Sequence, residues 1–152
     1  MPDEDEPWWA TVVMPVLFAA ARESYGRAIK VALAEVGCGD MPRSGSRLIG
    51  GIARSGQPMR DLVDEMGVSK QRTGQLIDVL VDRGYLTRET DPEDRRRLMV
   101  DLTERGTMAA EAIRRAVDRL DSTLEAAVGA EDVATLRRVA GTLVALNDPH
   151  FD

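Results

Sequence analysis

Three consecutive arginines, Arg95 to Arg97, are the residues whose types and spacing point most directly to a chemistry. Asp91 and Pro92 precede them and favour a turn, so the arginines are predicted to lie at an exposed tip, away from any core. An exposed arginine on a protruding loop can enter a DNA minor groove, where the potential is negative and the slot is narrow. The alternative is a set of surface ion pairs with Glu93 and Asp94, which would contribute little to stability. Both arrangements are compatible, because a neighbouring carboxylate can fix the rotamer of an arginine.

A second group of polar side chains lies on a predicted helix that follows Ser69 and ends at Gly84. At about 100° per residue, one face of this helix is centred on Gln71, Gln75 and Asp78. The flanks of that face carry Arg72 and Gly74, and the opposite face, predicted to be buried, carries Thr73, Leu76, Ile77 and Leu80. Glutamine and arginine can make paired hydrogen bonds with adenine and guanine in the major groove.

The start of the same helix is suited to a phosphate. Ser69 is a favourable N-cap, Lys70 adds a positive charge, and the N–H groups of a helix N-terminus attract anions. Gly74 would let the DNA backbone or a base approach closely, although a glycine inside a helix costs about 1 kcal/mol. The alternative interpretation is an ordinary solvated helix face, since surface helices commonly carry glutamine and arginine.

The elements around these residues form a helix-turn-helix followed by a hairpin. Leu62, Val63 and Met66 have helical spacing, and Gly67 favours a tight turn into the next helix. After Gly84 the pattern changes, and residues 85–87 and 98–102 are predicted to be strands around a charged tip.

Long helices are predicted on both sides of this middle region. They cover residues 16–36, 42–54, 103–128 and 131–146. Pro15 suits the first turn of the first helix, and Gly129 is predicted to separate the last two. The apolar stripes of the first and the last two helices are too long for a small middle lobe to cover. They are therefore predicted to pack on each other or on a second copy of the chain.

The composition is that of a globular protein in a reducing compartment. The chain has 152 residues, of which 43% are hydrophobic and only 4% aromatic, which favours helices over strands. Cys38 is the single cysteine, so no internal disulfide can form. The apolar run of residues 10–21 follows an acidic leader and is too short to span a bilayer. These features predict a cytoplasmic protein with no membrane partner.

The net charge of −6 argues at first against a nucleic-acid partner, but the charge is unevenly distributed. Residues 1–40 carry three basic and seven acidic side chains, and residues 104–152 carry six and nine. Residues 41–68 carry four basic and three acidic side chains, and residues 69–103 carry seven of each. Because binding responds to the local field, the neutral to basic middle remains compatible with DNA.

The run of residues 91–106, DPEDRRRLMVDLTERG, closely resembles the wing of the multiple antibiotic resistance regulator (MarR) family. The family pattern is roughly D-P-x-D-x-R followed by L-T-x-x-G. The matching residues are Asp91, Pro92, Asp94, Arg96, Leu102, Thr103 and Gly106. The stretch LVDEMGVSKQRTGQLIDVLVDRGYL resembles the helix-turn-helix of the same family, and the order of helices fits, so the resemblance covers nearly the whole chain.

The resemblance implies a mainly α-helical fold with a small β-hairpin, in which a winged helix-turn-helix lobe joins a helical dimerisation lobe. Residues 1–36 and 104–152 would form the dimerisation region, and residues 37–103 the DNA-binding domain. Within that domain, the helix-turn-helix would cover residues 58–84 and the wing residues 85–103. The implied function is a homodimeric transcriptional regulator, a repressor, that binds a palindromic operator in double-stranded DNA.

The resemblance also assigns roles to single residues. Arg96 would enter the minor groove, Asp94 would orient it, and Arg95 and Arg97 would contact phosphates. The segment used for the major groove contains Ser69, Lys70, Gln71, Arg72 and Gln75. Thr73, in place of a frequent aliphatic residue, and Gly74 depart from the family pattern and leave the base preference open.

A small-molecule effector is a further implication, because the family often binds aromatic or anionic molecules between its two lobes. The candidate ligand-binding residues are Phe18, Arg22, Tyr25 and Arg47, to which Trp8, Trp9 and Met14 could contribute. The alternative for each of them is an ordinary core or dimer contact. No motif identifies the ligand.

The sequence offers little for catalysis, metal binding or redox chemistry. His150 is the only histidine, and it lies near no plausible nucleophile. One histidine and one cysteine do not make a metal site of the usual kind, so no metal and no cofactor are expected. Cys38 lies in a glycine-rich loop after the first helix, and the simplest interpretation is an incidental cysteine rather than a redox sensor.

A function of another class remains open. The acidic total charge is compatible with a ligand-binding or protein-binding module that keeps this fold and does not bind an operator. Salt-dependent binding to the upstream DNA of its own gene separates the two functions.

Overall fold

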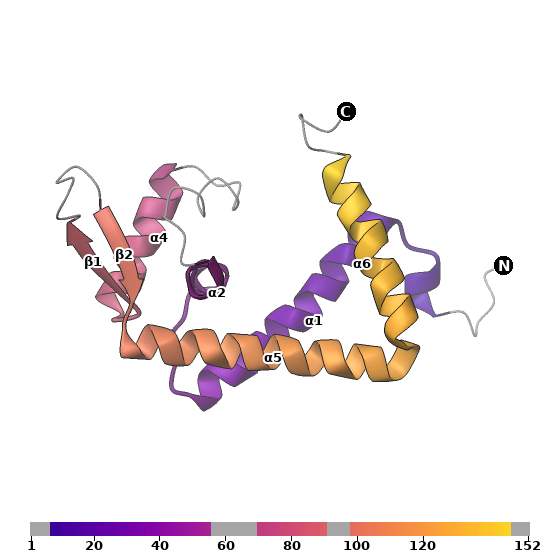
Figure 1. Ribbon diagram of the computed structural model, residues 1–152, viewed down its shortest axis with the longest axis horizontal. Coiled ribbons are helices and arrows are strands. Elements are labelled where there is room, and N and C mark those ends of the chain that lie inside the picture. The colour runs from indigo at the N-terminus through magenta and orange to yellow at the C-terminus, as the bar shows by residue number, and fades with distance from the viewer. Residues whose placement is uncertain (1–6, 56–69, 91–97, 147–152) are drawn as a thin grey trace. The chain divides into compact units, whose positions relative to one another are not determined.

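The computed structural model describes residues 7–55, 70–90 and 98–146, and its elements are labelled in Figure 1. The helices are the 3-10 helix η1 (Trp8–Ala10), α1 (Met14–Glu35), α2 (Gly45–Ser55), α4 (Lys70–Asp82), α5 (Glu104–Val128) and α6 (Ala130–Ala145). The strands are β1 (Leu86–Thr90) and β2 (Leu98–Leu102). The predicted mainly α-helical fold with a hairpin is therefore confirmed. The helix predicted around Leu62 to Met66 lies outside the described residues.

Proline and glycine set several helix ends. Pro15 occupies the first turn of α1, and Gly37, with φ of 73°, follows the end of that helix. Gly84 and Gly129 also have positive φ, 71° and 89°, after α4 and between α5 and α6. A positive φ is easily adopted only by glycine, so these residues end the helices where the sequence predicted.

The start of α2 differs from the prediction. The helix was expected from residue 42 but begins at Gly45, because the preceding residues form a turn in which the Gly45 N–H donates to the Pro42 carbonyl at 2.8 Å. A Cβ at Gly45 would lie 2.9 Å from Met41 Sδ and 3.0 Å from Leu80 Cδ2. The turn is thus packed closely against both side chains.

The chain divides into two compact units, Met1–Ala116 and Val117–Asp152. The core of the first unit takes side chains from α1, α2, α4, β1 and the first half of α5. Its buried members are Leu33, Cys38, Leu48, Ile49, Ile77, Leu80, Tyr85, Leu86, Ala109, Ala110 and Ile113. This single core holds α4 and the base of the hairpin in one body.

The hairpin is a two-stranded antiparallel sheet in which Leu86 pairs with Leu102 and Thr90 with Leu98. β1 packs against α4, and β2 contacts α2. Successive side chains of a strand point to opposite faces, and the face bearing Leu86 is buried while the face bearing Met99 is exposed. The first strand is longer than the predicted residues 85–87, because β1 pairs residue for residue with the whole of β2.

The start of α5 is tied to the base of the hairpin by Thr103. Its N–H donates to the Tyr85 carbonyl at 3.1 Å, and its hydroxyl donates to the Gly84 carbonyl at 2.6 Å. The same hydroxyl accepts the Gly106 N–H at 2.9 Å, which is the geometry of a helix N-cap. A Cβ at Gly106 would lie 2.1 Å from the Tyr85 carbonyl oxygen. Thr103 and Gly106 of the L-T-x-x-G pattern therefore join helix to hairpin.

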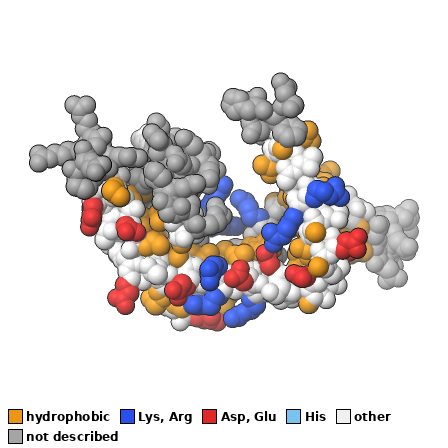
Figure 2. Space-filling model, in the orientation of Figure 1, with side chains coloured by type: hydrophobic (Ala, Val, Ile, Leu, Met, Phe, Trp, Pro, Cys, Tyr) orange, Lys and Arg blue, Asp and Glu red, His pale blue; other side chains and the backbone are white. Residues whose placement is uncertain are grey.

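The second unit holds the end of α5 and α6. Arg137 of α6 donates to Asp121 of α5 at 3.0 Å. Figure 2 shows hydrophobic side chains on the surface of α6. They are Leu136, Val139, Leu143 and Val144, each at least 47% exposed, and Leu146 follows the helix at 68%. The described chain leaves this apolar surface uncovered.

Among the helices described, none combines the length and the hydropathy needed to cross a membrane.

Candidate nucleic-acid interface

One face of α4 is buried against the core, as the helical angles predicted. Ile77 and Leu80 are fully buried, Thr73 is 2% exposed and Leu76 is partly buried. Thr73, which departs from the aliphatic residue frequent in the family pattern, is thus part of the buried face as predicted. Because this face is held by the core, the orientation of the opposite face is determined as well.

The opposite face of α4 is open to solvent. Gln71, Arg72, Gln75 and Asp78 are all exposed. Lys70 is the first residue of the helix, and Ser69 lies outside the described residues. The structure therefore brings Gln71, Arg72 and Gln75 together on one exposed surface, adjacent to the hairpin that packs on α4.

Gly74 lies on the flank of this surface. A Cβ placed there would have no neighbour within 4 Å, so internal packing does not require glycine at this position. A glycine inside a helix costs about 1 kcal/mol relative to alanine. No packing contact of the described residues offsets this cost. The glycine leaves the helix backbone accessible beside Gln71 and Gln75.

Arg88 of β1 reaches across to this helix. Its Nη2 lies 2.6 Å from Asp78 Oδ1, and the two side chains are 35% and 59% exposed. Asp78 was predicted on the open face, and Arg88 was not among the predicted site residues. The alternation of β1 could have revealed it, since Arg88 is two residues from the buried Leu86 and shares its face of the strand.

The base of the hairpin is held by a charged cluster that sequence reasoning also missed. The hydroxyl of Tyr85 donates to Asp40 Oδ1 at 2.5 Å, and Arg105 Nη2 donates to the same oxygen at 2.8 Å. The guanidinium of Arg105 stacks 4.3 Å from the centre of the Tyr85 ring. It also donates to the carbonyls of Arg83 at 2.5 Å and Gly37 at 3.2 Å. The cluster joins the loop after α1, the end of α4 and the start of α5.

The cluster shifts the pKa values of its acidic members in opposite directions. The hydrogen bond from Tyr85, helped by the charge of Arg105, holds the pKa of the Asp40 carboxyl below its usual value. Burial, followed by the hydrogen bond to Asp40, raises the pKa of the Tyr85 hydroxyl well above its usual value. Asp40 is therefore charged and Tyr85 neutral at neutral pH.

The predicted tip of the wing, with Asp94, Arg95, Arg96 and Arg97, lies outside the described residues. Its anchors are described, because Thr90 at the end of β1 pairs with Leu98 at the start of β2. The roles of the four tip residues remain predictions.

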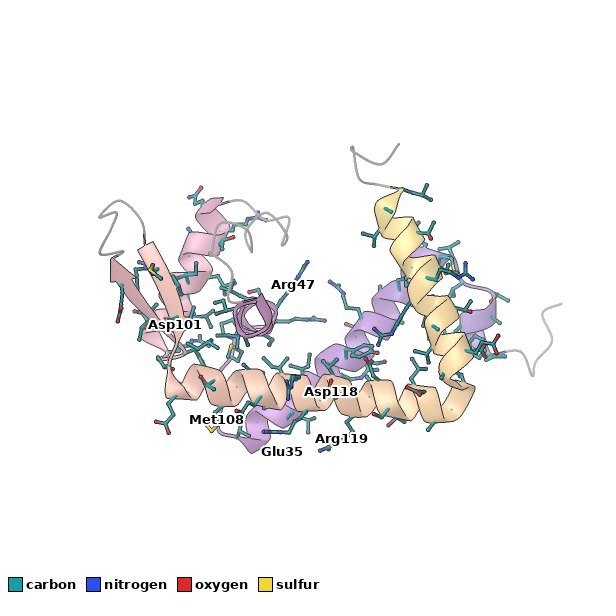
Figure 3. The ribbon with its side chains drawn as sticks, viewed as in Figure 1. Glu35, Arg47, Asp101, Met108, Asp118 and Arg119 are labelled. Carbon is teal, nitrogen blue, oxygen red and sulfur yellow. The ribbon has the colours of Figure 1, made fainter. Side chains whose placement is uncertain are left out.

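The candidate ligand-binding residues lie on two helices of the first unit. Phe18 and Tyr25 of α1 are partly buried, and Arg22 is exposed. Arg47 projects from α2 and is exposed (Figure 3). The structure does not define a ligand site from these four residues, which stay a prediction.

The remaining candidates for chemistry are few. Cys38 is fully buried in the core, with its thiol 3.7 Å from the Val36 carbonyl oxygen. Within the described ranges, no three or more His, Cys, Asp or Glu side chains are grouped to hold a metal ion. His150 lies outside those ranges.

The family model described as MarR family matches residues 40–97, which span α2, α4 and the first strand of the hairpin. No match was found among the curated proteins. Several solved structures match this chain over most of the length of both chains.

The DNA complex of MepR from S. aureus is 16% identical, with a TM-score of 0.72 over 90% of this chain and 97% of that one. The reduced form of MarR from E. coli is 21% identical, with a TM-score of 0.67 over 87% and 96%. NadR in complex with 4-hydroxyphenylacetate is 22% identical, with a TM-score of 0.65 over 94% and 97%. The MarR family model thus matches the middle of this chain, and the solved structures share its winged-helix fold.

Proposed function

We propose that the protein is a transcriptional repressor that binds a palindromic operator as a homodimer and is released by a small-molecule ligand. The observation that carries the proposal is the exposed surface of Gln71, Arg72 and Gln75 on α4, held by the core beside a wing-like hairpin. The likeness to the MepR–DNA complex supports the same arrangement.

In this proposal α4 enters the major groove. Gln71, Gln75 and Arg72 read base edges, while Ser69 and Lys70 contact a phosphate at the helix N-terminus. Arg96 enters the neighbouring minor groove, Asp94 orients it, and Arg95 and Arg97 contact phosphates. The wing therefore supplies most of the positive charge of the interface.

The second copy is needed to cover the apolar surface of α6. Leu136, Val139, Leu143 and Val144 are exposed in the described chain, and such a surface is unfavourable in water. We assign residues 1–36 and 104–152 to the dimer region and residues 37–103 to DNA binding. Two copies of α4 would then meet successive major grooves about 34 Å apart.

Release by a ligand would act on the spacing of the two α4 helices. The dimer would be in equilibrium between a form whose α4 spacing fits the operator and a form whose spacing does not. A ligand shifts this equilibrium away from DNA binding only if it binds the second form more tightly. Phe18, Arg22, Tyr25 and Arg47 offer aromatic rings and positive charge, which suit an aromatic or anionic molecule. The relative NadR, bound to 4-hydroxyphenylacetate, supports a ligand of this class.

In this role the protein would be a cytoplasmic regulator without catalytic activity, metal or cofactor. Its acidic charge lies mainly in residues 1–40 and 104–152, which are assigned to the dimer rather than to DNA. The electrostatic objection to DNA binding therefore does not apply to residues 41–103.

The test is the affinity for the upstream region of the protein's own gene, measured over a range of salt concentrations. Arg96→Ala should remove most of the affinity while dimerisation and helicity persist. Arg119→Ala is the matched control, because it removes the same charge from an exposed position on α5 (Figure 3) and should bind normally. Wild-type affinity in Arg96→Ala would contradict the role of the wing.

The same measurement distinguishes operator binding from the competing function. A wild-type protein with no specific complex, and with no response of binding to salt, would favour a ligand-binding or protein-binding module of the same fold.

A further inference from the structure

Asp78 lies on the proposed base-reading surface although a carboxylate is repelled by DNA phosphates. At about 100° per residue it is about 20° from Gln71 and 60° from Gln75 around α4. Its side chain is 59% exposed. A negative charge at this place weakens binding unless a cation neutralises it or a base donates a hydrogen bond to it.

Arg88 supplies the neutralising charge from a fixed position. It lies opposite Val100 in the hairpin and shares the inward face of β1 with the buried Leu86. Because β1 packs against α4, the Arg88 side chain extends from the sheet to the helix and meets Asp78 Oδ1 at 2.6 Å. The pair is a contact between the two elements proposed to touch DNA.

The pair leaves the carboxylate able to bind a further group. A carboxylate accepts hydrogen bonds at about four lone-pair positions, and Arg88 Nη2 uses one oxygen, Oδ1. Exposed ion pairs contribute little to folding stability, so the main effect of Arg88 is on the orientation and charge of Asp78. In the major groove, the amino group N4 of cytosine is the donor that a carboxylate recognises.

We propose that Asp78 reads a cytosine through its N4 amino group and that Arg88 is the positioning residue that orients and neutralises this carboxylate. The inference rests on the proposed function, since it requires α4 to enter the major groove. It adds a base preference and a residue of the hairpin to the reading surface of Gln71, Arg72 and Gln75.

The first experiment measures base preference by selection from a library of randomised half-sites. Asp78→Asn should lower the preference for cytosine at one base pair about tenfold. The base preferences at the other positions of the half-site should stay the same. Asp78→Glu keeps the charge but moves the carboxylate, and it should lose the same preference. Asp101→Asn is the matched control, because Asp101 is an exposed carboxylate on the other face of the hairpin (Figure 3).

The second experiment separates positioning from direct contact. Arg88→Ala should weaken binding to every sequence, because it leaves Asp78 negative and unpaired near the phosphates. Adding Asp78→Asn to Arg88→Ala should restore the affinity for non-specific DNA to about that of wild type, because the double variant has the same local net charge as the intact pair. Circular dichroism and sedimentation would confirm that each variant keeps its fold and its oligomeric state.

Three outcomes would contradict the inference. If Asp78→Asn and Asp78→Glu keep the cytosine preference, Asp78 reads no base. If the double variant remains as weak as Arg88→Ala, Arg88 contacts DNA itself and is not a positioning residue. A wild-type protein without any sequence preference would overturn the proposed function as well, whereas the first two outcomes leave that function intact.

Discussion

Gly106 and Tyr85 approach so closely that a Cβ at position 106 would lie 2.1 Å from the Tyr85 carbonyl oxygen. The same Tyr85 carbonyl accepts the N–H of Thr103 at 3.1 Å. The first turn of α5 therefore rests on the backbone at the start of the hairpin.

Gly106→Ala should destabilise the first unit, because backbone must move to accommodate the added methyl group. Overpacking of this kind costs about 1–3 kcal/mol or more. Chemical denaturation, followed by circular dichroism, measures the loss. Gly141→Ala is the control, since a Cβ at that position on α6 has no neighbour within 4 Å, and it should be neutral or stabilising. Equal stability of Gly106→Ala and wild type would refute the close approach.

Gly74→Ala should separate stability from DNA binding. Open space surrounds the added methyl group, and alanine favours the helix, so the free energy of unfolding should rise by about 1 kcal/mol. If DNA approaches α4 at this point, affinity for the operator should fall at the same time. Denaturation and fluorescence anisotropy with labelled DNA measure the two effects. Unchanged affinity would show that the backbone at Gly74 is not approached.

Asp40 should make folding stability depend on acidity. Its pKa in the folded protein lies below that in the unfolded chain, so its stabilising contribution is complete above the unfolded pKa of about 3.9. That contribution is lost as the pH falls through the folded pKa. Asp40→Asn should therefore flatten the acid limb of the stability curve.

Tyr85 should make folding stability depend on pH in the alkaline range. Its pKa in the folded protein is raised, so the unfolded chain loses this proton first, from about pH 10. Stability should fall as the pH rises above that value. Tyr85→Phe should be less stable at neutral pH, where the bond to Asp40 is lost, and should show a shallower alkaline decline. Denaturation at pH 7 to 11 tests both statements, and an unchanged alkaline slope would oppose the second.

Leu143→Asp should dissociate the proposed homodimer. Leu143 is 53% exposed on α6, and a charge there would be buried without a partner if a second copy covers the surface. Sedimentation velocity measures the change from dimer to monomer. Ala134→Asp places the same charge at an exposed position about 180° around α6 from Leu143 and should remain dimeric. A dimeric Leu143→Asp would place the interface elsewhere.

Local patterns in the sequence determined the elements and the face of α4 that is buried. Periodic apolar residues predicted α1, α5 and α6, and glycines with positive φ lie at the predicted breaks. The burial of Thr73, Ile77 and Leu80 followed from the helical repeat, which leaves Gln71 and Gln75 exposed. These predictions succeeded because helical periodicity and backbone preference act over a few residues.

Only the tertiary structure decided which distant residues meet. Arg105 and Asp40 are 65 positions apart in the chain and share a hydrogen bond at 2.8 Å. Arg88 joins Asp78 because β1 packs on α4, and Gly106 is required because α5 begins against Tyr85. A charged residue in a local pattern is compatible with many partners, so its partner is selected by the packing of the core and not by its neighbours in sequence.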